Sequence, residues 1–408
     1  MSTGAAAKSL HTGHRSWLRP RGPVCGGVAS DARAPGMKIE RIPGKTAGAV
    51  VHGIDLVHMS DGEWTQLEAA FLEHGFLVIK SNPLSSAEQT AFGHRFGAIE
   101  FGGAPMANQS KDGVIASVTS QQMRTNIGNE MWHTDSTYKP VSSKVAMLTA
   151  RVLPQSGGGQ TGLADMRAAY DNLGVETKQR IEHLSAYHST QFSQANDMGD
   201  FPPENPLSLY HGSSFLRRLV KVHPTTGDRS IFVARHAFGV CRTDDPAVRL
   251  PRKESRELLH RLVQNAVADE RAVYVHEWEV GDTLLWDNRR LLHRAFPYDY
   301  SEPRVLIGTR VEGDDDCVAD NVTGCVAGEL SVQATPEFPF GQCGTQVLAE
   351  ELSMQRQEVA QGVPRMLAET LPDAIVPGSS VREHTTVPPL SPAQEQALER
   401  ARSPQPKL

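Results

Sequence analysis

The sequence predicts a mainly β fold with flanking α-helices, built on a double-stranded β-helix, the jelly roll of cupin-like proteins. Short runs of apolar and β-branched residues are separated by irregular loops, as in jelly rolls and related β-sandwiches. Two of these runs, 272–280 and 282–288, follow one another with no helix between them. A doubly wound parallel sheet would need strict alternation of strands and helices, so this pair argues against that class.

The first elements of the fold are marked by helix caps. Ser60 and Ser85 are each followed three residues later by a glutamate, which is the capping-box pattern that opens a helix. Gly75 is expected to end the first of these helices, and the apolar run 76–80 follows as a buried strand. The folded region is therefore expected to begin with a helix, a strand and a second helix.

The remainder of the folded region is predicted to be mostly strands. Their expected ranges are 144–153, 230–240, 272–280, 282–288 and 304–313. The glycines at 157–159 are not followed by the lysine of a phosphate loop and indicate a flexible connection between strands. Helices are expected over 164–173 and 251–268.

The two ends of the chain differ in composition from its middle, and 37–320 is the predicted folded domain. Residues 1–36 are basic and rich in Gly, Ala and Ser, which is compatible with an organelle transit peptide; the alternative is an over-extended start before Met37. Residues 321–408 are predicted to form a low-complexity tail, because they lack the apolar content to order themselves. One helix is expected within this tail, over 348–363.

Net charge and cysteine usage narrow the class of protein. A net charge of -6 and a pI near 6.2 argue against a binder of nucleic acid, and no apolar run has the length of a membrane span. The 5 cysteines form no C-x-x-C pair, which favours free thiols in a reducing compartment. We therefore expect a cytoplasmic protein, or a mitochondrial one if the N-terminal extension is a transit peptide.

The stretch "MWHTDSTYKP" places His133 and Asp135 two positions apart. If this run is a strand, both side chains point to one face and can converge on one metal ion. The spacing alone arises by chance in a chain with 16 histidines, so a third ligand is required. His293, which follows a predicted strand and turn late in the domain, is the strongest candidate, and His236 and His276 are weaker ones.

Two histidines and one carboxylate form the facial triad of non-haem Fe(II) oxygenases, which leaves coordination positions open. Such an enzyme also needs a group that holds a dianionic cosubstrate. Arg304 lies eleven residues after His293, and its guanidinium could hold a carboxylate through two hydrogen bonds. Thr161 could add a hydroxyl donor. A structural histidine and a surface ion pair of Arg304 remain the alternatives at this point.

Four sequence blocks together resemble the TauD/TfdA family of Fe(II)/2-oxoglutarate-dependent dioxygenases. In order along residues 37–313, they are "GNEMWHTDSTYKP", "GGGQTGLADMRAAYDNL", "HPTTGDRSIFVARH" and "VGDTLLWDNRRLLHRAFPYD". The segments "WHTDSTYKPV" and "ADMRAAYD" are most similar to the aryloxyalkanoate-degrading branch, of the 2,4-dichlorophenoxyacetate type. The resemblance implies an oxidoreductase with Fe(II) as its metal and with 2-oxoglutarate and O2 as cosubstrates, in which His133, Asp135 and His293 bind the iron.

The same resemblance implies roles for other residues. Arg304 and Thr161 would hold the C5 carboxylate of 2-oxoglutarate, and Asn129 would line the substrate pocket. The implied reaction hydroxylates a small organic substrate and releases succinate and carbon dioxide; an ether or sulfonate bond breaks where the hydroxylated carbon carries an oxygen. Asp135 argues against the halogenating variants of this chemistry, in which a small residue replaces this ligand. Members of the family often associate, so a homo-oligomer is compatible with the resemblance.

One position departs from the family pattern. Members that act on sulfonates or carboxylates usually have a second arginine four residues after the first, and here that position is Gly308. Arg310 lies two residues further on, and strand alternation puts 304, 308 and 310 on one side. Either Arg310 binds the substrate anion in an altered pocket, or the substrate is neutral, for example a heterocycle. The absence of the second arginine favours the neutral substrate.

Two other classes of function remain as alternatives. A catalytically silent jelly-roll protein could bind a ligand or partner, with the C-terminal tail as its interaction segment. A zinc hydrolase could also use two histidines and one carboxylate. The combination of all three ligands with Arg304 argues against both classes.

Overall fold

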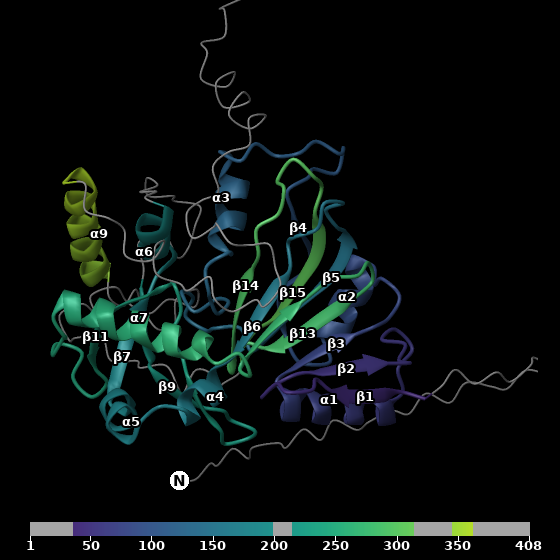
Figure 1. The fold of residues 1–408 in the computed structure, drawn as a ribbon, viewed down its shortest axis with the longest axis horizontal. Helices are drawn as coiled ribbons and strands as arrows, with labels where there is room; N and C mark the ends of the chain where they lie inside the picture. Colours follow the sequence, from purple (N-terminus) through teal and green to yellow (C-terminus); the bar gives the residue numbers. More distant parts are fainter. Residues whose placement is uncertain (1–35, 199–213, 314–344, 362–408) are drawn as a thin grey trace, which may run out of the picture. The chain divides into compact units, whose positions relative to one another are not determined.

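The computed structural model describes residues 36–198, 214–313 and 345–361 (Figure 1). Almost all of the predicted extension 1–36 and most of the predicted tail 321–408 lie outside these ranges, so their boundaries stay predictions. Among the described residues, Cys241 is a buried free thiol. No helix within the described ranges combines the length and the apolar character needed to cross a membrane.

The largest β-sheet has seven strands in the order β1-β2-β3-β13-β5-β15-β4. Neighbouring strands in it are antiparallel, except that β2 and β3 run parallel. The late strands β13 and β15 are thus inserted between early ones, which is the crossing expected of a jelly roll rather than of a meander. The strands span Lys38–Arg41 (β1), Ala49–His52 (β2), Phe76–Ile79 (β3), Ile99–Ala107 (β4), Val145–Val152 (β5), Thr283–Asp287 (β13) and Val305–Val311 (β15).

Smaller sheets contain the other strands of the described residues. One has the antiparallel order β12-β6-β14, a second has the antiparallel order β11-β7-β8, and β10 pairs with β9 in a short ribbon. The strands span Thr161–Asp165 (β6), Leu184–His188 (β7), Phe215–Arg218 (β8), Val220–Val222 (β9), Arg229–Ile231 (β10), Ala237–Arg242 (β11), Val273–His276 (β12) and Leu291–Ala295 (β14).

The predicted helix caps are present. Ser60 accepts a hydrogen bond from the backbone N–H of Glu63, Ser85 accepts one from that of Glu88, and both glutamates return the bond to the cap residue. Gly75 ends the first helix with a left-handed φ of 77°. The helices span Asp61–His74 (α1), Ser86–Gly93 (α2), Gln121–Gly128 (α3), Met166–Asp171 (α4), Val175–Glu182 (α5), Thr190–Ser193 (α6), Gln194–Met198 (the π-helix η1), Arg252–Ala268 (α7) and Thr345–Ala360 (α9).

The seven-stranded sheet and the sheet β12-β6-β14 pack face to face. One buried cluster contains Phe76 and Trp286 from the large sheet and Leu163 from the small one. The other face of the large sheet is covered by α1 and α2, which bury Leu77 and Leu285 with them (Figure 1). Because both of its faces are covered, the central strands are apolar on both sides. The predicted mainly β fold with helices packed outside it is confirmed.

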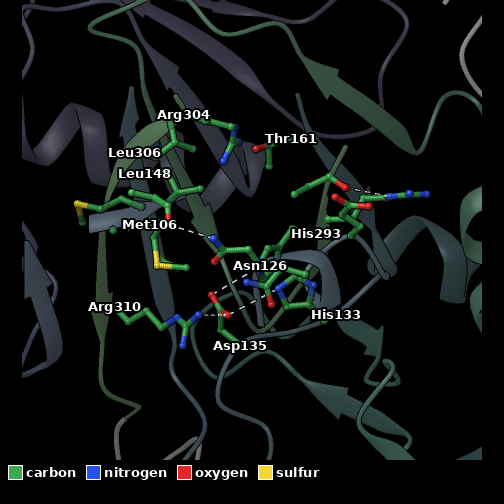
Figure 2. Close-up of a pocket in the computed structure, with 18 of the residues that line it drawn as sticks. Met106, Asn126, His133, Asp135, Leu148, Thr161, His293, Arg304, Leu306 and Arg310 are labelled. Carbon is green, nitrogen blue, oxygen red and sulfur yellow. Dashed lines mark hydrogen bonds and ion pairs between the residues drawn. The ribbon is translucent and has the colours of Figure 1, made fainter. Parts of the chain in front are cut away.

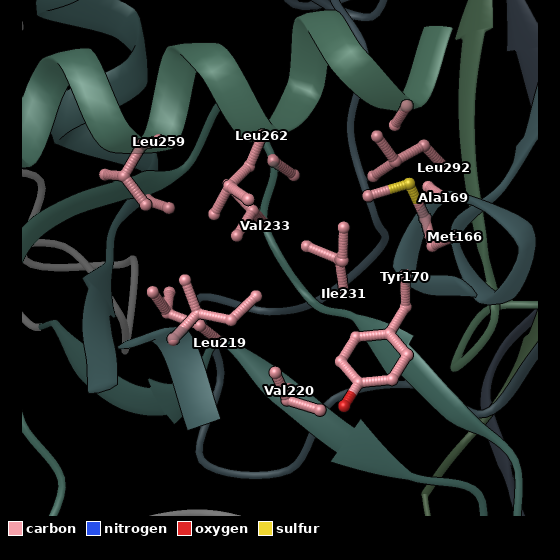
Figure 3. Packing of buried hydrophobic residues seen from close by; sticks show 14 of the residues in the cluster. Met166, Ala169, Tyr170, Leu219, Val220, Ile231, Val233, Leu259, Leu262 and Leu292 are labelled. Atoms are coloured by element: carbon pink, nitrogen blue, oxygen red, sulfur yellow. The ribbon is translucent and has the colours of Figure 1, made fainter. Parts of the chain in front are cut away.

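A second core lies under the long helix α7. Leu259 and Leu262 project from α7 toward Ile231, and Met166 and Tyr170 of α4 close the cluster on another side (Figure 3). This core supports the small sheets, and one of their strands, β14, carries His293 of the functional site.

One predicted strand is wrong, and one predicted helix is shorter than expected. The run 230–240 is not one strand, because β10 ends at Ile231 and β11 begins at Ala237, whose N–H donates to the carbonyl of Ala234 at 2.9 Å. Phe232, Val233 and Ala234 in this connection are apolar because they are buried in the core, and for that reason the run resembles a continuous strand. The helix expected over 164–173 begins only at Met166, since the strand β6 occupies the preceding residues.

A buried ion pair joins the small sheet to the N-terminal part of the fold. Asp165 is 0% exposed and accepts hydrogen bonds from Arg290 at 3.1 and 3.0 Å and from Thr46 at 2.9 Å. The same arginine donates to the carbonyl of Glu73 at 3.1 Å, near the end of α1. Removal of Asp165 would leave Arg290 buried without its ion pair, which costs about 3–5 kcal/mol.

Helix α9 packs against the outside of the sheet β11-β7-β8 and against α6. Leu348 is buried together with Phe192 and Phe238. Arg252 of α7 donates to Glu351 of α9 at 2.9 Å and also pairs with Glu358. The helix lies largely within 348–363, where the sequence predicts one.

The replacement of Leu262 by Ala tests the core under α7. Leu262 is 1% exposed, so we expect Leu262→Ala to lower the free energy of unfolding by about 2–5 kcal/mol, through lost burial and the remaining cavity. Urea denaturation followed by circular dichroism measures the change. Val248→Ala is the control, because Val248 is 47% exposed and its truncation should change stability by no more than about 0.5 kcal/mol. Equal effects of the two variants would contradict this account of the core.

Candidate active site

Backbone hydrogen bonds bring two of the predicted metal ligands together. His133 and His293 form an isolated antiparallel bridge, in which each N–H donates to the other residue's carbonyl at 2.9 Å. His293 lies in β14, whereas His133 lies in the loop that follows α3. The centroids of the two imidazole rings are 4.1 Å apart, and both side chains are buried.

Asp135 does not lie on a strand, so the strand expected around it is wrong. The chain turns directly after Asp135, where Ser136 has a positive φ of 58°. The side chain of Asn288 holds this turn: its Oδ1 accepts from the N–H of Asp135 at 2.9 Å, and its Nδ2 donates to the carbonyl of Asp135 at 3.0 Å. The turn, and not strand alternation, therefore directs the carboxylate toward the two histidines.

The three predicted ligands form one cluster with the donor atoms of a metal site. A ligand atom from each of His133, Asp135 and His293 lies within 4.8 Å of the others (Figure 2). The Nδ1–H of His133 donates to the carbonyl of Met131 at 2.8 Å, which leaves Nε2 as the lone-pair nitrogen facing the cluster. Nε2 of His293 lies 3.4 Å from Oδ2 of Asp135. Two imidazoles and one carboxylate suit Fe(II) with open positions.

The charges around the cluster favour the ligand forms of these side chains. Burial lowers the pKa of His133 well below its usual value, so the imidazole is neutral. Burial alone would raise the pKa of Asp135, but the charge of Arg310 and the contacts with His293 lower it far below its usual range. Arg310 is ion-paired with Oδ1 of Asp135. A neutral imidazole and an ionised carboxylate are the forms that bind metal.

A cavity between the two facing sheets contains this cluster at one end and the predicted cosubstrate residues at the other. Arg304 and Thr161 point into the same part of the cavity (Figure 2). Arg304 donates to the carbonyl of Gly159 at 2.7 Å and stacks near Tyr298. Thr161 accepts from the indole N–H of Trp278 at 3.2 Å. Arg304 is buried, yet none of the carboxylates in the described ranges forms an ion pair with it.

A second cavity opens on the other side of the metal cluster. Asn129, the residue after α3, lines both cavities, as expected for a substrate residue. Arg310 also lines both, so the strand β15 contributes to each. The remaining charged and aromatic side chains of the second cavity are Arg124, Arg235, Tyr138 and His236. Asp135 is the only carboxylate among its described lining residues.

The weaker histidine candidates lie outside the metal cluster. His236 lines the second cavity, where its Nδ1 is 2.9 Å from the hydroxyl of Ser193 and its ring centroid is 6.5 Å from that of His133. His276 lies on β12 and faces Asp282 at 3.2 Å. Neither residue is in the position of a third ligand.

Sequence reasoning missed several residues of the site. Asn288 and Arg235 both lie inside blocks that carry the family resemblance, "LLWDN" and "VARH", and that position was the only available signal. Asn288 contacts Asp135 and Arg235 contacts Gly128, and each of these partners is far away in the sequence. Glu130 lies three residues before His133, but nothing in its neighbours indicates that Tyr300 contacts it.

Residues 38–310 match the model of the family described as "Taurine catabolism dioxygenase TauD, TfdA family". The chain belongs to this family. The match covers most of the described residues and ends at Arg310, so that helix α9 lies beyond it.

Individual TauD/TfdA relatives indicate the branch. The chain is 41% identical over 278 residues to an (S)-phenoxypropionate/alpha-ketoglutarate-dioxygenase of Sphingobium herbicidovorans, which covers 66% of this chain and 93% of that protein. It is 34% identical over 285 residues to an alpha-ketoglutarate-dependent 2,4-dichlorophenoxyacetate dioxygenase of Cupriavidus pinatubonensis, covering 63% of this chain and 92% of that protein. The crystal structure of AAD-2 in complex with Mn(II) and N-oxalylglycine superimposes with a TM-score of 0.63 at 33% identity, over 68% of this chain and 98% of that one.

These relatives confirm the predicted class of enzyme. The protein is an oxidoreductase, an Fe(II)- and 2-oxoglutarate-dependent dioxygenase that acts on a small organic substrate. The predicted resemblance to the aryloxyalkanoate branch and the predicted jelly-roll core are confirmed by the same comparisons.

The contact between Asn288 and Asp135 predicts an effect on metal affinity. We expect Asn288→Ala to weaken Mn(II) binding by about 10–100-fold, because the turn that directs the carboxylate loses both of its side-chain hydrogen bonds. Isothermal titration calorimetry measures the affinity, with circular dichroism as the check on folding. Asn172→Ala is the control, since its amide bonds only to Asp269 on the surface. Unchanged affinity in folded Asn288→Ala would rule out the positioning role.

Proposed function

We propose that His133, Asp135 and His293 bind the Fe(II) of this dioxygenase, and that Arg304 and Thr161 bind the C5 carboxylate of 2-oxoglutarate. The single observation that carries this proposal is the cluster of two imidazoles and one carboxylate in the wall of a cavity whose far end holds a buried arginine. When bound, the metal and 2-oxoglutarate would activate O2, so that one oxygen atom hydroxylates a substrate carbon and the other enters succinate, with release of carbon dioxide.

Arg304 is suited to hold an anion. Burial lowers the pKa of its guanidinium, because a buried cation without a negatively charged partner is costly in free energy. Its contacts are a backbone carbonyl and the face of Tyr298, neither of which carries a full negative charge. A carboxylate that binds there through two hydrogen bonds would supply the missing charge. Thr161 adds a hydroxyl at the same end of the cavity.

We propose that the substrate is an aryloxyalkanoate-like carboxylic acid that binds in the second cavity. Relatives are named for phenoxypropionate and 2,4-dichlorophenoxyacetate, and the second cavity carries Arg124, Arg235 and Arg310 beside the metal ligands. Hydroxylation of the carbon that carries the ether oxygen would give a hemiketal or hemiacetal. Its collapse breaks the carbon–oxygen bond and releases a phenol and an oxo acid.

The local packing explains how this substrate class is compatible with Gly308. A Cβ at this position would lie 3.0 Å from Cγ of Met106 and 3.5 Å from Leu148, so the space of the usual second arginine is filled by other side chains. Arg310 lines the cavity from the same strand, but it is ion-paired with Asp135. We propose that Arg310 orients this metal ligand, and that it shares the binding of the substrate anion with Arg235 on the opposite wall. This arrangement favours the anionic substrate over the neutral alternative.

We also propose a reducing, cytoplasmic location. Cys241, a free thiol among the described residues, is compatible with it, and burial raises the pKa of this thiol to about 12. A buried, protonated thiol is a small apolar side chain and not a redox group.

Anaerobic titration with Fe(II) and 2-oxoglutarate tests the cofactor site. We expect the weak visible charge-transfer absorption of a keto acid chelated to Fe(II) in the wild type, its loss in Asp135→Ala and a weaker band at equal concentration in Arg304→Gln. Lys38→Gln is the control, because Lys38 is exposed and pairs only with Glu40. The absence of the band in folded, iron-loaded wild type would overturn the proposed site.

Steady-state kinetics with a matched pair of substrates tests the substrate class. The enzyme should release phenol from 2-phenoxypropionate, with much less turnover of the neutral amide. Arg235→Gln should raise KM for the acid by about tenfold, the worth of one charge-assisted hydrogen bond, with a smaller effect on the amide. Arg242→Gln, whose side chain pairs with Asp244 on the surface, should behave as the wild type. Equal kinetics for acid and amide would favour a neutral substrate instead.

A further inference from the structure

A buried glutamate lies in the wall of the first cavity and is not used by the chemistry above. Glu130 is 9% exposed and lies in the short connection between α3 and His133. The hydroxyl of Tyr300 donates a hydrogen bond to its Oε1. No arginine, lysine or histidine in the described part of the chain forms an ion pair with it. A carboxylate in such surroundings is costly to keep ionised.

The groups that face Glu130 connect it to the cosubstrate end of the cavity. Two arginines, Arg294 of β14 and Arg304 next to β15, act on it through their charge. On the intervening loop, the ring of Tyr298 lies 4.9 Å from that of Tyr300 and 5.5 Å from the guanidinium of Arg304. Asn126 and Asn129, the cavity residues on the side of α3, do not titrate. Glu130, the two tyrosines and Arg304 therefore form one contiguous wall.

The charge of Glu130 in this wall changes near neutral pH. Burial raises the pKa of Glu130 to about 7, against the hydrogen bond from Tyr300 and the charges of Arg294 and Arg304, which lower it. The pKa of Arg304 is lowered by burial, while Tyr298 and Glu130 act in the opposite direction. Before a cosubstrate binds, Glu130 is thus the one described carboxylate whose charge supports the guanidinium of Arg304.

We propose that Glu130 is a proton-linked positioning residue for the cosubstrate, which takes up a proton when the carboxylate of 2-oxoglutarate binds Arg304. The incoming carboxylate supplies the negative charge that Arg304 needs, so the charge of Glu130 is no longer compensated. A protonated Glu130 removes the repulsion between two anions in one buried site. This inference rests on the proposed role of Arg304 in binding 2-oxoglutarate.

The sign of the pH dependence follows from linkage. Anion binding raises the pKa of Glu130 above its value of about 7 in the unliganded protein, so the complex holds more protons than its components. The affinity for 2-oxoglutarate is then highest below pH 7 and falls as the pH rises, with a limit of about tenfold per pH unit for one linked proton. If Glu130 only anchors Tyr300, the affinity is independent of its titration.

Calorimetry of 2-oxoglutarate binding to the Mn(II)-loaded protein measures the linked proton directly. Titrations at pH 7 and pH 8, each in buffers of different ionisation enthalpy, give the number of protons taken up. We expect about half a proton at pH 7 and a larger fraction at pH 8, because a group with a pKa near 7 is half protonated before the ligand binds. Over the same range the Kd should rise several-fold.

Two variants and a control make the measurement specific to Glu130. Glu130→Gln keeps an acceptor for Tyr300 but cannot titrate, so its proton uptake should vanish and its Kd should be independent of pH. Tyr300→Phe removes the hydrogen bond that lowers the pKa of Glu130, so the uptake should move to higher pH. Glu277→Gln removes an exposed carboxylate that bonds to Gln160, and it should behave as the wild type.

The outcomes separate this inference from the proposed function. Normal binding of 2-oxoglutarate without proton uptake in the wild type, or the same uptake in Glu130→Gln, would overturn the role of Glu130 and leave the cosubstrate site intact. Unchanged binding in Arg304→Gln would overturn the proposed cosubstrate site and the inference with it. Loss of uptake in Glu130→Gln alone, with weakened binding in Arg304→Gln, would establish both.

Discussion

The two backbone hydrogen bonds between His133 and His293 are the contact on which the functional site depends. They join the loop after α3 to the strand β14, two segments that are far apart in the sequence. Because a hydrogen-bonded antiparallel pair fixes the separation of the two Cα atoms at about 5.5 Å, the imidazoles must lie side by side. Main-chain hydrogen bonds therefore bring the two imidazoles together, and side-chain contacts only orient the ligand atoms.

The charges of the site are distributed unequally between its two ends. At the metal end, Asp135 has a cationic partner in Arg310, so one of its oxygens is held while the other faces His293. At the cosubstrate end, Arg304 has no such partner among the described carboxylates, and only Glu130 acts on it from a distance. A buried cation without an ion pair is destabilising in the empty protein, and this cost is recovered when an anion binds. The polarity of the cavity thus favours one orientation of a bound keto acid, with a carboxylate at Arg304.

The sequence was sufficient to predict which residues lie together in the candidate site. His133, Asp135 and His293 meet in one cluster and Arg304 and Thr161 share one end of a cavity, as the motifs predict. The path of the chain between them was not predictable, because the turn at Ser136 depends on Asn288, which hydrogen-bonds to it from another part of the fold. The break within 230–240 was hidden because the buried loop residues Phe232, Val233 and Ala234 are as apolar as strand residues.

The residues that line the second cavity could not be predicted from the sequence, for a different reason. Arg124 is indistinguishable in the sequence from the many arginines that pair on the surface, and for Arg235 the only signal is its position inside a block that carries the family resemblance. Their relation to the metal cluster arises only when α3 and the segment before β11 are packed around the same hollow. The motifs indicated which residues bind the metal, whereas the side chains that other elements bring to the second cavity were not indicated by any motif.

Helix α9 has a practical consequence for the preparation of this enzyme. The family match ends at Arg310, yet Leu348 and its neighbours on α9 cover Phe192 and Phe238 on the main body of the fold. A recombinant protein that is shortened to the limits of its relatives would carry these aromatic rings on its surface. Such a shortened enzyme would expose an apolar patch and aggregate at the concentrations needed for crystals. The C-terminal helix therefore belongs in any sample intended for structural work.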